Sequence, residues 1–273
     1  MNARWTLGGS SARSFLFTLA AVLISSESVW ADSELMLPYP AIYGKIPAAT
    51  FDAGRRRVGD ANLKVEKLED GTVRLFVESG VDGGARTVAT ATLAPIANTN
   101  LLRPIFQQSR SFDADNKPLG VMSIDHITRE ATCSLPRSNG QGMRTQRVRL
   151  PKHDRVANVP LNLLFDPLVK GDASTVDFQI LLCRSNAKLL DFRARVVRKK
   201  EGSDGSEHLV EIRYGPDFGS VLSLLASAVV PRLSFWFDPA LPNPWIAHRM
   251  PLYAGGPEVL VVRQGIETSI LLD

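Results

Sequence analysis

Short segments in which apolar and polar residues alternate recur along most of this 273-residue chain. In residues 63–77, apolar residues at odd positions lie on both sides of the dipeptide Asp70-Gly71. Alternation with a period of two places one set of side chains on each face of a strand, and Asp-Gly favours a tight turn between strands. The segment therefore predicts a β-hairpin.

The same pattern predicts many further strands. They fall at residues 86–93, 103–112, 119–126, 131–135, 144–150, 176–182, 191–199, 208–214, 233–237, 245–253 and 259–263. About a dozen strands separated by short turns indicate one antiparallel sheet, and so many strands are unusual in a flat sheet. We expect a mainly β protein, with a strongly curved antiparallel sheet or incomplete β-barrel.

Two segments lack this alternation and predict short apolar helices. Residues 158–171 begin with Asn158 as a candidate N-cap, and Pro167 should end or kink the helix after about two turns. Residues 220–230 have only serine as polar side chains. A helix so apolar must be surrounded on most sides, yet it is too short to span a membrane. We expect the curved sheet to enclose both helices.

The first 31 residues have the three parts of a secretory signal peptide. Arg4 and Arg13 are basic, residues 15–24 are apolar, and Val29-Trp30-Ala31 offers small residues for cleavage. Ten apolar residues in a helix reach only about 15 Å, half a bilayer core. We expect export to the periplasm by the general secretory route and a mature chain with no transmembrane segment. A buried N-terminal helix is the alternative.

The mature chain is expected to form one domain. Residues 32–57 are rich in proline and aromatic residues and predict an extended N-terminal arm, whereas residues 58–273 predict a single curved-sheet domain. Cys133 and Cys183 are its two cysteines. In an oxidising compartment we expect them to form a disulfide, with two separate buried thiols as the alternative.

Charge and composition exclude several classes of protein. Lys and Arg exceed Asp and Glu by 32 to 28, and 44% of residues are hydrophobic, so neither disorder nor a nucleic-acid partner is indicated. Three basic clusters fit either an anionic surface or, as we prefer, a solvated strand face balanced by carboxylates: Arg55–Arg57, Arg144/Arg147/Arg149 and Arg193/Arg195/Arg198–Lys200.

No motif in the sequence indicates catalysis, a metal or a cofactor. The four histidines lack the spacing of a zinc site, and no nucleophile elbow or phosphate-binding loop is present. Aromatic residues concentrate near residues 235–253, where they pack a closing hairpin or line the mouth of a cavity.

Short phrases of the sequence carry a resemblance to a known group of proteins. They are Gly59-Asp60-Ala61 with the hairpin that follows, Leu102-Arg103-Pro104, and the closing phrases WFD, HRMPLY and GPEVLVVR. In these the chain resembles exported bacterial proteins of unknown function with the half-barrel architecture of periplasmic lipoprotein carriers. The resemblance implies an incomplete barrel around helices, with an apolar hollow for an acyl chain, and it implies no catalytic residues.

These observations lead to one functional hypothesis and two alternatives. The leading hypothesis is binding or carriage of a hydrophobic small molecule, a lipid or a lipidated segment in the cell envelope. We expect the cavity to be lined by Leu222, Leu225, Val229, Phe235 and Trp236. The alternatives are a non-enzymatic assembly or scaffold protein with a filled core and an envelope protein partner, and an envelope glycan or lipid hydrolase.

Overall fold

The computed structural model describes residues 34–137, 140–184, 186–201, 207–217 and 233–271. Within these residues fifteen strands form one sheet. The first strands are β1 (Leu37–Pro38), β2 (Gly44–Phe51), β3 (Arg57–Lys67), β4 (Val73–Gly80), β5 (Arg86–Pro95), β6 (Leu101–Phe112), β7 (Pro118–Asp125), β8 (Glu130–Pro136) and β9 (Met143–Arg149). The later strands are β10 (Thr175–Cys183), β11 (Ala187–Glu201), β12 (Glu207–Pro216), β13 (Leu233–Phe237), β14 (Trp245–Pro251) and β15 (Glu258–Arg263).

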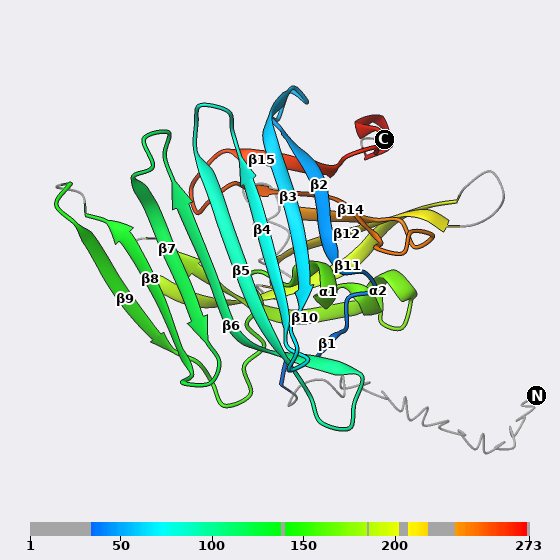
Figure 1. Ribbon diagram of the computed structural model, residues 1–273, viewed down its shortest axis with the longest axis horizontal. Helices are drawn as coiled ribbons and strands as arrows, with labels where there is room; N and C mark the ends of the chain where they lie inside the picture. Colours follow the sequence, from blue (N-terminus) through cyan, green and yellow to red (C-terminus); the bar gives the residue numbers. More distant parts are fainter. Residues whose placement is uncertain (1–33, 138–139, 185, 202–206, 218–232, 272–273) are drawn as a thin grey trace, which may run out of the picture. The chain divides into compact units, whose positions relative to one another are not determined.

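The sheet follows the chain in two runs that join at β15 and β2. Its order is β10 to β15, then β2 to β9, and β1 pairs separately with β6. All of these strand pairs are antiparallel. Figure 1 shows the sheet curving so that the β10–β11 side passes behind β4 to β8. The outermost strands, β9 and β10, do not pair with each other, so the sheet is an incomplete barrel, as expected.

The first hairpin shows why the alternating pattern produces strands. In β3 the odd-numbered residues from Gly59 to Val65 are buried, while the even-numbered residues face outward. At the turn to β4, Gly71 has a φ of +82°, which suits glycine, and the Asp70 carboxylate accepts a hydrogen bond from the Thr72 N–H at 2.9 Å. The predicted hairpin is therefore confirmed.

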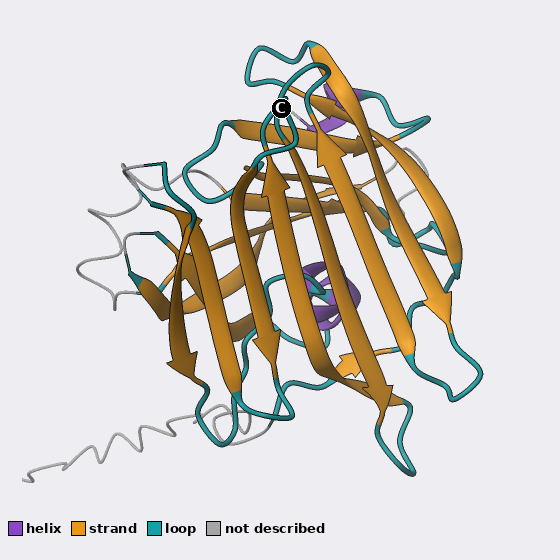
Figure 2. Cartoon of the chain, turned by 60° about the vertical axis from the view of Figure 1, so that its left-hand side comes forward, coloured by secondary structure: helices purple, strands orange, loops and turns teal. Residues whose placement is uncertain are grey.

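Register shifts accompany the curvature of the sheet. They occur between β2 and β3, β5 and β6, β6 and β7, β11 and β12, and β13 and β14. An extra residue on one strand bends that strand and increases its local twist. Figure 2 shows the resulting curve, with the first helices inside it.

The division into an arm and a domain differs from the expected one. β2 lies inside the expected arm of residues 32–57, yet it pairs with β15 on one side and with β3 on the other. Proline-rich sequence suggested an arm, but Pro47 lies where the β2–β15 pairing ends, and its carbonyl accepts a hydrogen bond from the Gln264 N–H. The expected signal peptide, residues 1–31, lies outside the described residues.

Two short helices, α1 (Leu161–Leu164) and α2 (Asp166–Lys170), occupy the first predicted helical segment. Pro160, not Asn158, is the N-cap of α1. Pro167 lies in the first turn of α2, where its missing N–H does no harm, and Gly171 ends that helix with a φ of +79°. The second predicted helix, residues 220–230, lies outside the described residues.

Three clusters of buried apolar side chains hold the fold together. The interior cluster lies on the concave side and includes Leu63, Leu75, Phe165, Phe178 and Phe235. The seam cluster lies between β7–β8 and β10 and comprises Ile124, Ala131, Cys133, Leu150, Val156, Leu181 and Cys183. The outer cluster comprises Leu209, Trp236, Ile246, Ala247, Leu260, Val262 and Leu271, the last from a 3-10 helix, η1 (Thr268–Leu271).

Candidate ligand-binding interior

Phe165 is placed at the centre of the concave side by the break between α1 and α2. The chain cannot continue α1 through Pro167, and Phe165 serves as the C-cap of α1 and the N-cap of α2. Its side chain has no solvent exposure. At this position the Phe165 ring contacts side chains of three strands, β10, β12 and β13.

Four aromatic rings from distant parts of the chain meet around this position. The ring centroid of Phe165 lies 5.8 Å from that of Phe178, 5.5 Å from that of Tyr214 and 5.4 Å from that of Phe235. Two of the three contacts are edge-to-face, a favoured arrangement for aromatic pairs. Burial raises the pKa of the Tyr214 hydroxyl, so this group stays neutral. Packed aromatic rings occupy this half of the concave side.

His248 extends the aromatic cluster along β14. Its ring stacks on Phe235 at 5.2 Å and lies 5.7 Å from Trp245. Burial lowers the pKa of His248 to about 4, because the charged form loses its hydration. The imidazole is therefore neutral at pH 7 and serves as one more ring of the interior.

The predicted lining residues do not all share this interior. Phe235 belongs to the interior cluster, but Trp236 lies in the outer cluster on the other face of β13. Adjacent residues of a strand face opposite sides, so the two side chains do not line one cavity together. The Arg249 guanidinium lies over the Trp236 ring at 5.6 Å. Leu222, Leu225 and Val229 lie outside the described residues.

The other half of the concave face carries smaller side chains. In the sheet register, Val77 of β4 is followed by Ala89 of β5, Ser109 of β6 and Met122 of β7. We call these four residues the shallow row. Each is partly exposed, whereas Ala91 and Gln107, two positions further along β5 and β6, are fully buried.

Leu252, in the loop after β14, contacts the row of residues next to the shallow row, which contains Thr87 and Ser111. The Thr87 hydroxyl donates a hydrogen bond to the carbonyl of Leu252, a residue of the interior cluster, at 2.7 Å. Thr87 also lies 2.9 Å from the Ser111 hydroxyl. This contact shows that the row next to the shallow row faces the interior too.

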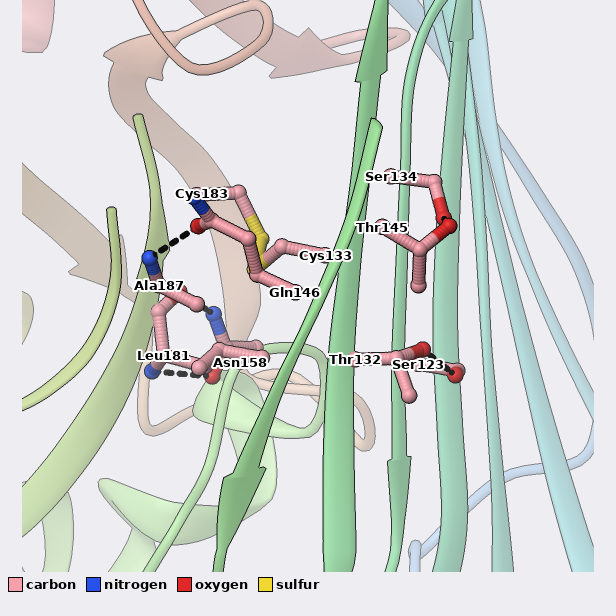
Figure 3. The surroundings of a disulfide bond; sticks show 10 residues. All are labelled: Ser123, Thr132, Cys133, Ser134, Thr145, Gln146, Asn158, Leu181, Cys183 and Ala187. Carbon is pink, nitrogen blue, oxygen red and sulfur yellow. Dashed lines mark hydrogen bonds between the residues drawn. A yellow bond between two sulfur atoms is a disulfide. The ribbon is translucent and has the colours of Figure 1, made fainter. Parts of the chain in front are cut away.

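The open side of the sheet is held by a disulfide and by side-chain amides. Cys133 of β8 is bonded to Cys183 of β10, with 5.5 Å between the Cα atoms, which confirms the predicted disulfide. Gln146 of β9 accepts a hydrogen bond from the Ala187 N–H at 2.5 Å. Figure 3 shows both links on the same side of β8 and β9. We call this region the seam.

The segment between β9 and α1, residues 150–160, covers the edge of β10, and we call it the strap. Val156 forms a parallel bridge with Gln179, and Asn158 acts as a further strand neighbour through its side chain. The Asn158 amide donates to the Leu181 carbonyl and accepts from the Leu181 N–H, both at 2.9 Å. The edge of β10 is therefore occupied.

Gln107 attaches the strap to the inner face of β6. Its side chain is fully buried, its amide oxygen accepts hydrogen bonds from the N–H groups of Asn158 and Val159, and its amide nitrogen donates to the Val156 carbonyl. The same nitrogen lies 2.9 Å from Nε2 of His126. On the other side of the ring, His126 Nδ1 lies 2.8 Å from the Asp154 carboxylate.

The His126–Asp154 pair resembles part of a catalytic triad, but its surroundings are those of a structural contact. Because Nδ1 faces a carboxylate and Nε2 faces an amide donor, the contacts are satisfied when Nδ1–H donates to Asp154 and Nε2 accepts from Gln107. The Gln107 amide thus occupies the place from which a general base would take a proton. The geometry assigns the pair to holding the strap.

A polar groove of about 430 Å³ lies outside the interior, where the loops after β4 and β6 meet β3. Its charged lining residues are Asp60, Glu78, Asp82, Arg86 and Asp113. Arg86 donates to the Asn116 side chain at 3.1 Å and lies 3.7 Å from Glu78. Charges of this kind do not suit an apolar ligand.

Several arginines of the basic clusters have carboxylate partners. Arg193 contacts both Asp177 and Asp217, and Arg56 contacts Asp52. Among the described residues, no group of three or more His, Cys, Asp or Glu side chains has the arrangement of a metal site. In that same part of the chain, no helix has both the length and the apolar character needed to cross a membrane.

Sequence reasoning missed four residues of the interior: Phe165, Phe178, Tyr214 and His248. A usable signal exists for Tyr214, which shares the parity of Ile212 on a predicted strand and therefore its face. His248 lies within a predicted strand, but nothing in its neighbours distinguishes a buried histidine from an exposed one. Phe165 was one of several apolar residues in the first helical segment.

No protein-family model matches the sequence, and no curated protein matches it either. Among solved structures, the chain is similar to a crystal structure described as a beta-barrel-like protein of the domain of unknown function DUF1849 from Brucella abortus. The TM-score is 0.43 at 9% sequence identity, and the match covers 85% of this chain and 97% of the other. A similarity at this level supports no assignment of function, and export of the chain remains a prediction.

Proposed function

We propose that the protein binds or carries a hydrophobic ligand, a lipid acyl chain or a lipidated protein segment, on the concave face of its sheet. We place this activity in the periplasm, after export directed by residues 1–31. The disulfide supports an oxidising compartment, where such bonds persist. The protein is proposed to act by binding and not by catalysis.

The observation that carries the proposal is the change in side-chain size across the concave face. Four aromatic rings fill one half, whereas the shallow row has Ala89 and Ser109 at its centre, both partly exposed. An acyl chain lying along this row would cover Val77 and Met122 at its ends. Each methylene removed from water contributes about 0.8 kcal/mol, so a chain can be held without a charged anchor.

The proposal is tested by native mass spectrometry of mature protein purified from a periplasm, together with solvent extraction. We expect a lipid-sized adduct, or uptake of a fatty acid offered to the purified protein. Ala89→Phe should abolish the adduct by filling the shallow row. Thr90→Phe is the matched control, because the next residue of β5 faces outward and should leave binding unchanged.

Two outcomes would contradict the proposal. One is wild-type protein that neither carries lipid nor takes any up; the other is Ala89→Phe protein that binds as well as wild type. Melting temperatures of both variants must be compared with that of wild type, so that lost binding is not confused with lost folding.

A second candidate is an envelope-assembly or scaffold protein with a filled core. The dense packing of Phe165, Phe178, Tyr214 and Phe235 favours it, since each of these side chains is at most 5% exposed. This candidate predicts no adduct and an envelope protein recovered by crosslinking. An envelope hydrolase has less support, because Gln107 occupies Nε2 of the buried histidine–carboxylate pair.

A further inference from the structure

The two outer strands of the sheet differ in what covers them. The edge of β10 is occupied by the strap, through the Val156–Gln179 bridge and the Asn158 amide. β9 pairs only with β8 among the described strands, and the chain leaves it at Leu150 to cross toward β10. Within the part of the chain that the structure describes, one edge is therefore occupied, and the other has no strand partner.

Hydrogen bonds at both ends of the β8–β9 pair identify the unpaired backbone groups. Leu150 N–H donates to Arg129 and Arg137 N–H donates to Gly142, so the even-numbered residues of β9 hydrogen-bond to β8. In an antiparallel pair, the groups of the intervening residues point away from the partner. The N–H and C=O groups of Thr145, Arg147 and Arg149 consequently face the open edge.

The side chains of the same residues lie on the outward face of the sheet. Thr145 forms a hydroxyl–hydroxyl contact with Ser134 at 2.7 Å, and Figure 3 shows this contact on the side of β8 opposite the disulfide. Arg147 and Arg149 share that face because strand residues two apart point the same way. Both are exposed, and the ion pair of Arg147 with Glu130 is long, at 3.6 Å.

We propose that β9 is a docking edge for an extended acidic segment of a partner protein, which adds a strand to the sheet. Unpaired backbone groups provide the hydrogen bonds of strand addition, and the side-chain charges determine which segment fits. Arg147 and Arg149 lie two residues apart on one face, so the matching segment has acidic residues at alternate positions. This interaction is separate from ligand binding on the concave face.

Charge selects this occupant over a second copy of the same chain. Pairing of two β9 strands would place the arginines of one copy beside those of the other on the same face, and like charges on adjacent strands are destabilising. An acidic strand replaces this repulsion with attraction. An anionic membrane also matches the charge, but it makes no use of the unpaired N–H groups.

The test uses the full mature chain and a synthetic seven-residue peptide, the length of β9, in which Glu alternates with Thr. Hydrogen exchange should show slower exchange of the Thr145, Arg147 and Arg149 amides when the peptide is present. A peptide with Lys in place of Glu should have no effect. In the Arg147→Glu/Arg149→Glu variant, affinity for the acidic peptide should fall at least about tenfold.

A pair of variants separates the backbone contribution from the charges. Thr145→Pro removes an N–H that faces the open edge but no bond to β8, so it should weaken peptide binding about tenfold or more. Thr145→Ala loses the same hydroxyl and keeps the N–H, and its affinity should stay close to that of wild type. Arg195→Glu, an exposed arginine on β11, is the control for charge reversal elsewhere.

Three results would overturn the proposal. The first is equal peptide affinity in Thr145→Pro and Thr145→Ala. The second is binding to phosphatidylglycerol vesicles that requires Arg147 and Arg149 but not the Thr145 N–H, with no binding of the peptide, which would indicate a membrane surface. The third is a dimer of the wild-type chain in sedimentation that protects the β9 amides, which would indicate pairing of two copies.

Discussion

Gln107 and His248 are polar side chains inside the fold, and they are accommodated in different ways. The Gln107 amide uses both its oxygen and its nitrogen in hydrogen bonds with the strap. His248 is accommodated as an aromatic ring, stacked on Phe235 and kept neutral by burial. The contribution of Gln107 to stability depends on its hydrogen-bond partners, whereas the contribution of His248 depends on pH.

Replacing Gln107 with leucine should destabilise the fold by about 3 kcal/mol. The change leaves the partly buried N–H groups of Asn158 and Val159 without an acceptor and the buried Val156 carbonyl without its donor. An unsatisfied buried polar group carries a desolvation penalty of about 1–3 kcal/mol. Urea unfolding of the protein measures the loss in unfolding free energy. Gln108→Leu is the control, because Gln108 is the next residue of β6, is partly exposed and faces outward. An equal loss of stability in both variants would contradict the role assigned to Gln107.

Acidification should weaken the fold through His248. The folded-state pKa is about 4, below the ordinary value of 6.5, so the unfolded chain binds more protons between these two values. Stability from this group is complete above about pH 6.5 and falls as the pH drops toward 4, by up to about 3 kcal/mol. Unfolding free energies measured from pH 7 to pH 4 test the effect.

His248→Phe provides the matching control for the pH effect. Phenylalanine keeps a ring against Phe235 but cannot titrate. The variant should lose most of the difference in unfolding free energy between pH 6.5 and pH 4. If its pH dependence equals that of wild type, another group is responsible.

At the level of elements, the alternating pattern predicted most strands, but it did not predict β2 or the pairing of Asn158 with β10. Alternation located the β3–β4 hairpin and most later strands, because one face of each strand is buried and the other is wet. It missed β2, where Pro47 is tolerated at the end of a pairing. It also assigned Asn158 to a helix cap, whereas the side chain pairs with β10; local sequence does not specify a partner 23 residues away.

Replacing Asn158 with alanine should expose the edge of β10 locally. The variant removes both bonds to Leu181, so exchange of the Leu181 amide should become at least about tenfold faster, with little change in distant strands. Hydrogen exchange with mass spectrometry or NMR detects this. Gln179→Ala is the control, since the side chain of Gln179 contacts Asp191 while its backbone pairs with the strap.

For the whole molecule, the disulfide is the covalent link across the seam. It closes a loop of 50 residues that contains β9, the strap, both helices and most of β10. In the chain-entropy model such a link contributes about 4 kcal/mol by restricting the unfolded chain. Its effect is therefore expected to exceed that of any single hydrogen bond in the seam.

The Cys133→Ala/Cys183→Ala variant should be about 4 kcal/mol less stable than the oxidised wild type. Urea unfolding with and without a reducing agent measures this difference, and the reductant should have no effect on the variant. A wild-type protein equally stable in both conditions would show that the seam is held by packing and the amide contacts alone.

The candidate interior was only partly predictable, because it depends on how distant segments converge. Phe235 was found from its place in an aromatic strand, and Trp236 was assigned to the same lining although the strand geometry separates them. Phe165 became recognisable only through its contacts with rings of distant strands, whereas the strand parity of Tyr214 indicated its face but not its neighbours. The pairing of Cys133 with Cys183 was predictable because the sequence has two cysteines.

The absence of pairing between the described strands β9 and β10 also removes a geometric restriction. In a closed barrel, the number of strands and their stagger must agree, so adding a strand changes the tilt of every other strand. Here the sheet ends at β9, and the closure depends on a disulfide, two amide side chains and the strap. Hairpins could be gained or lost beyond β9 during evolution while every existing strand kept its register.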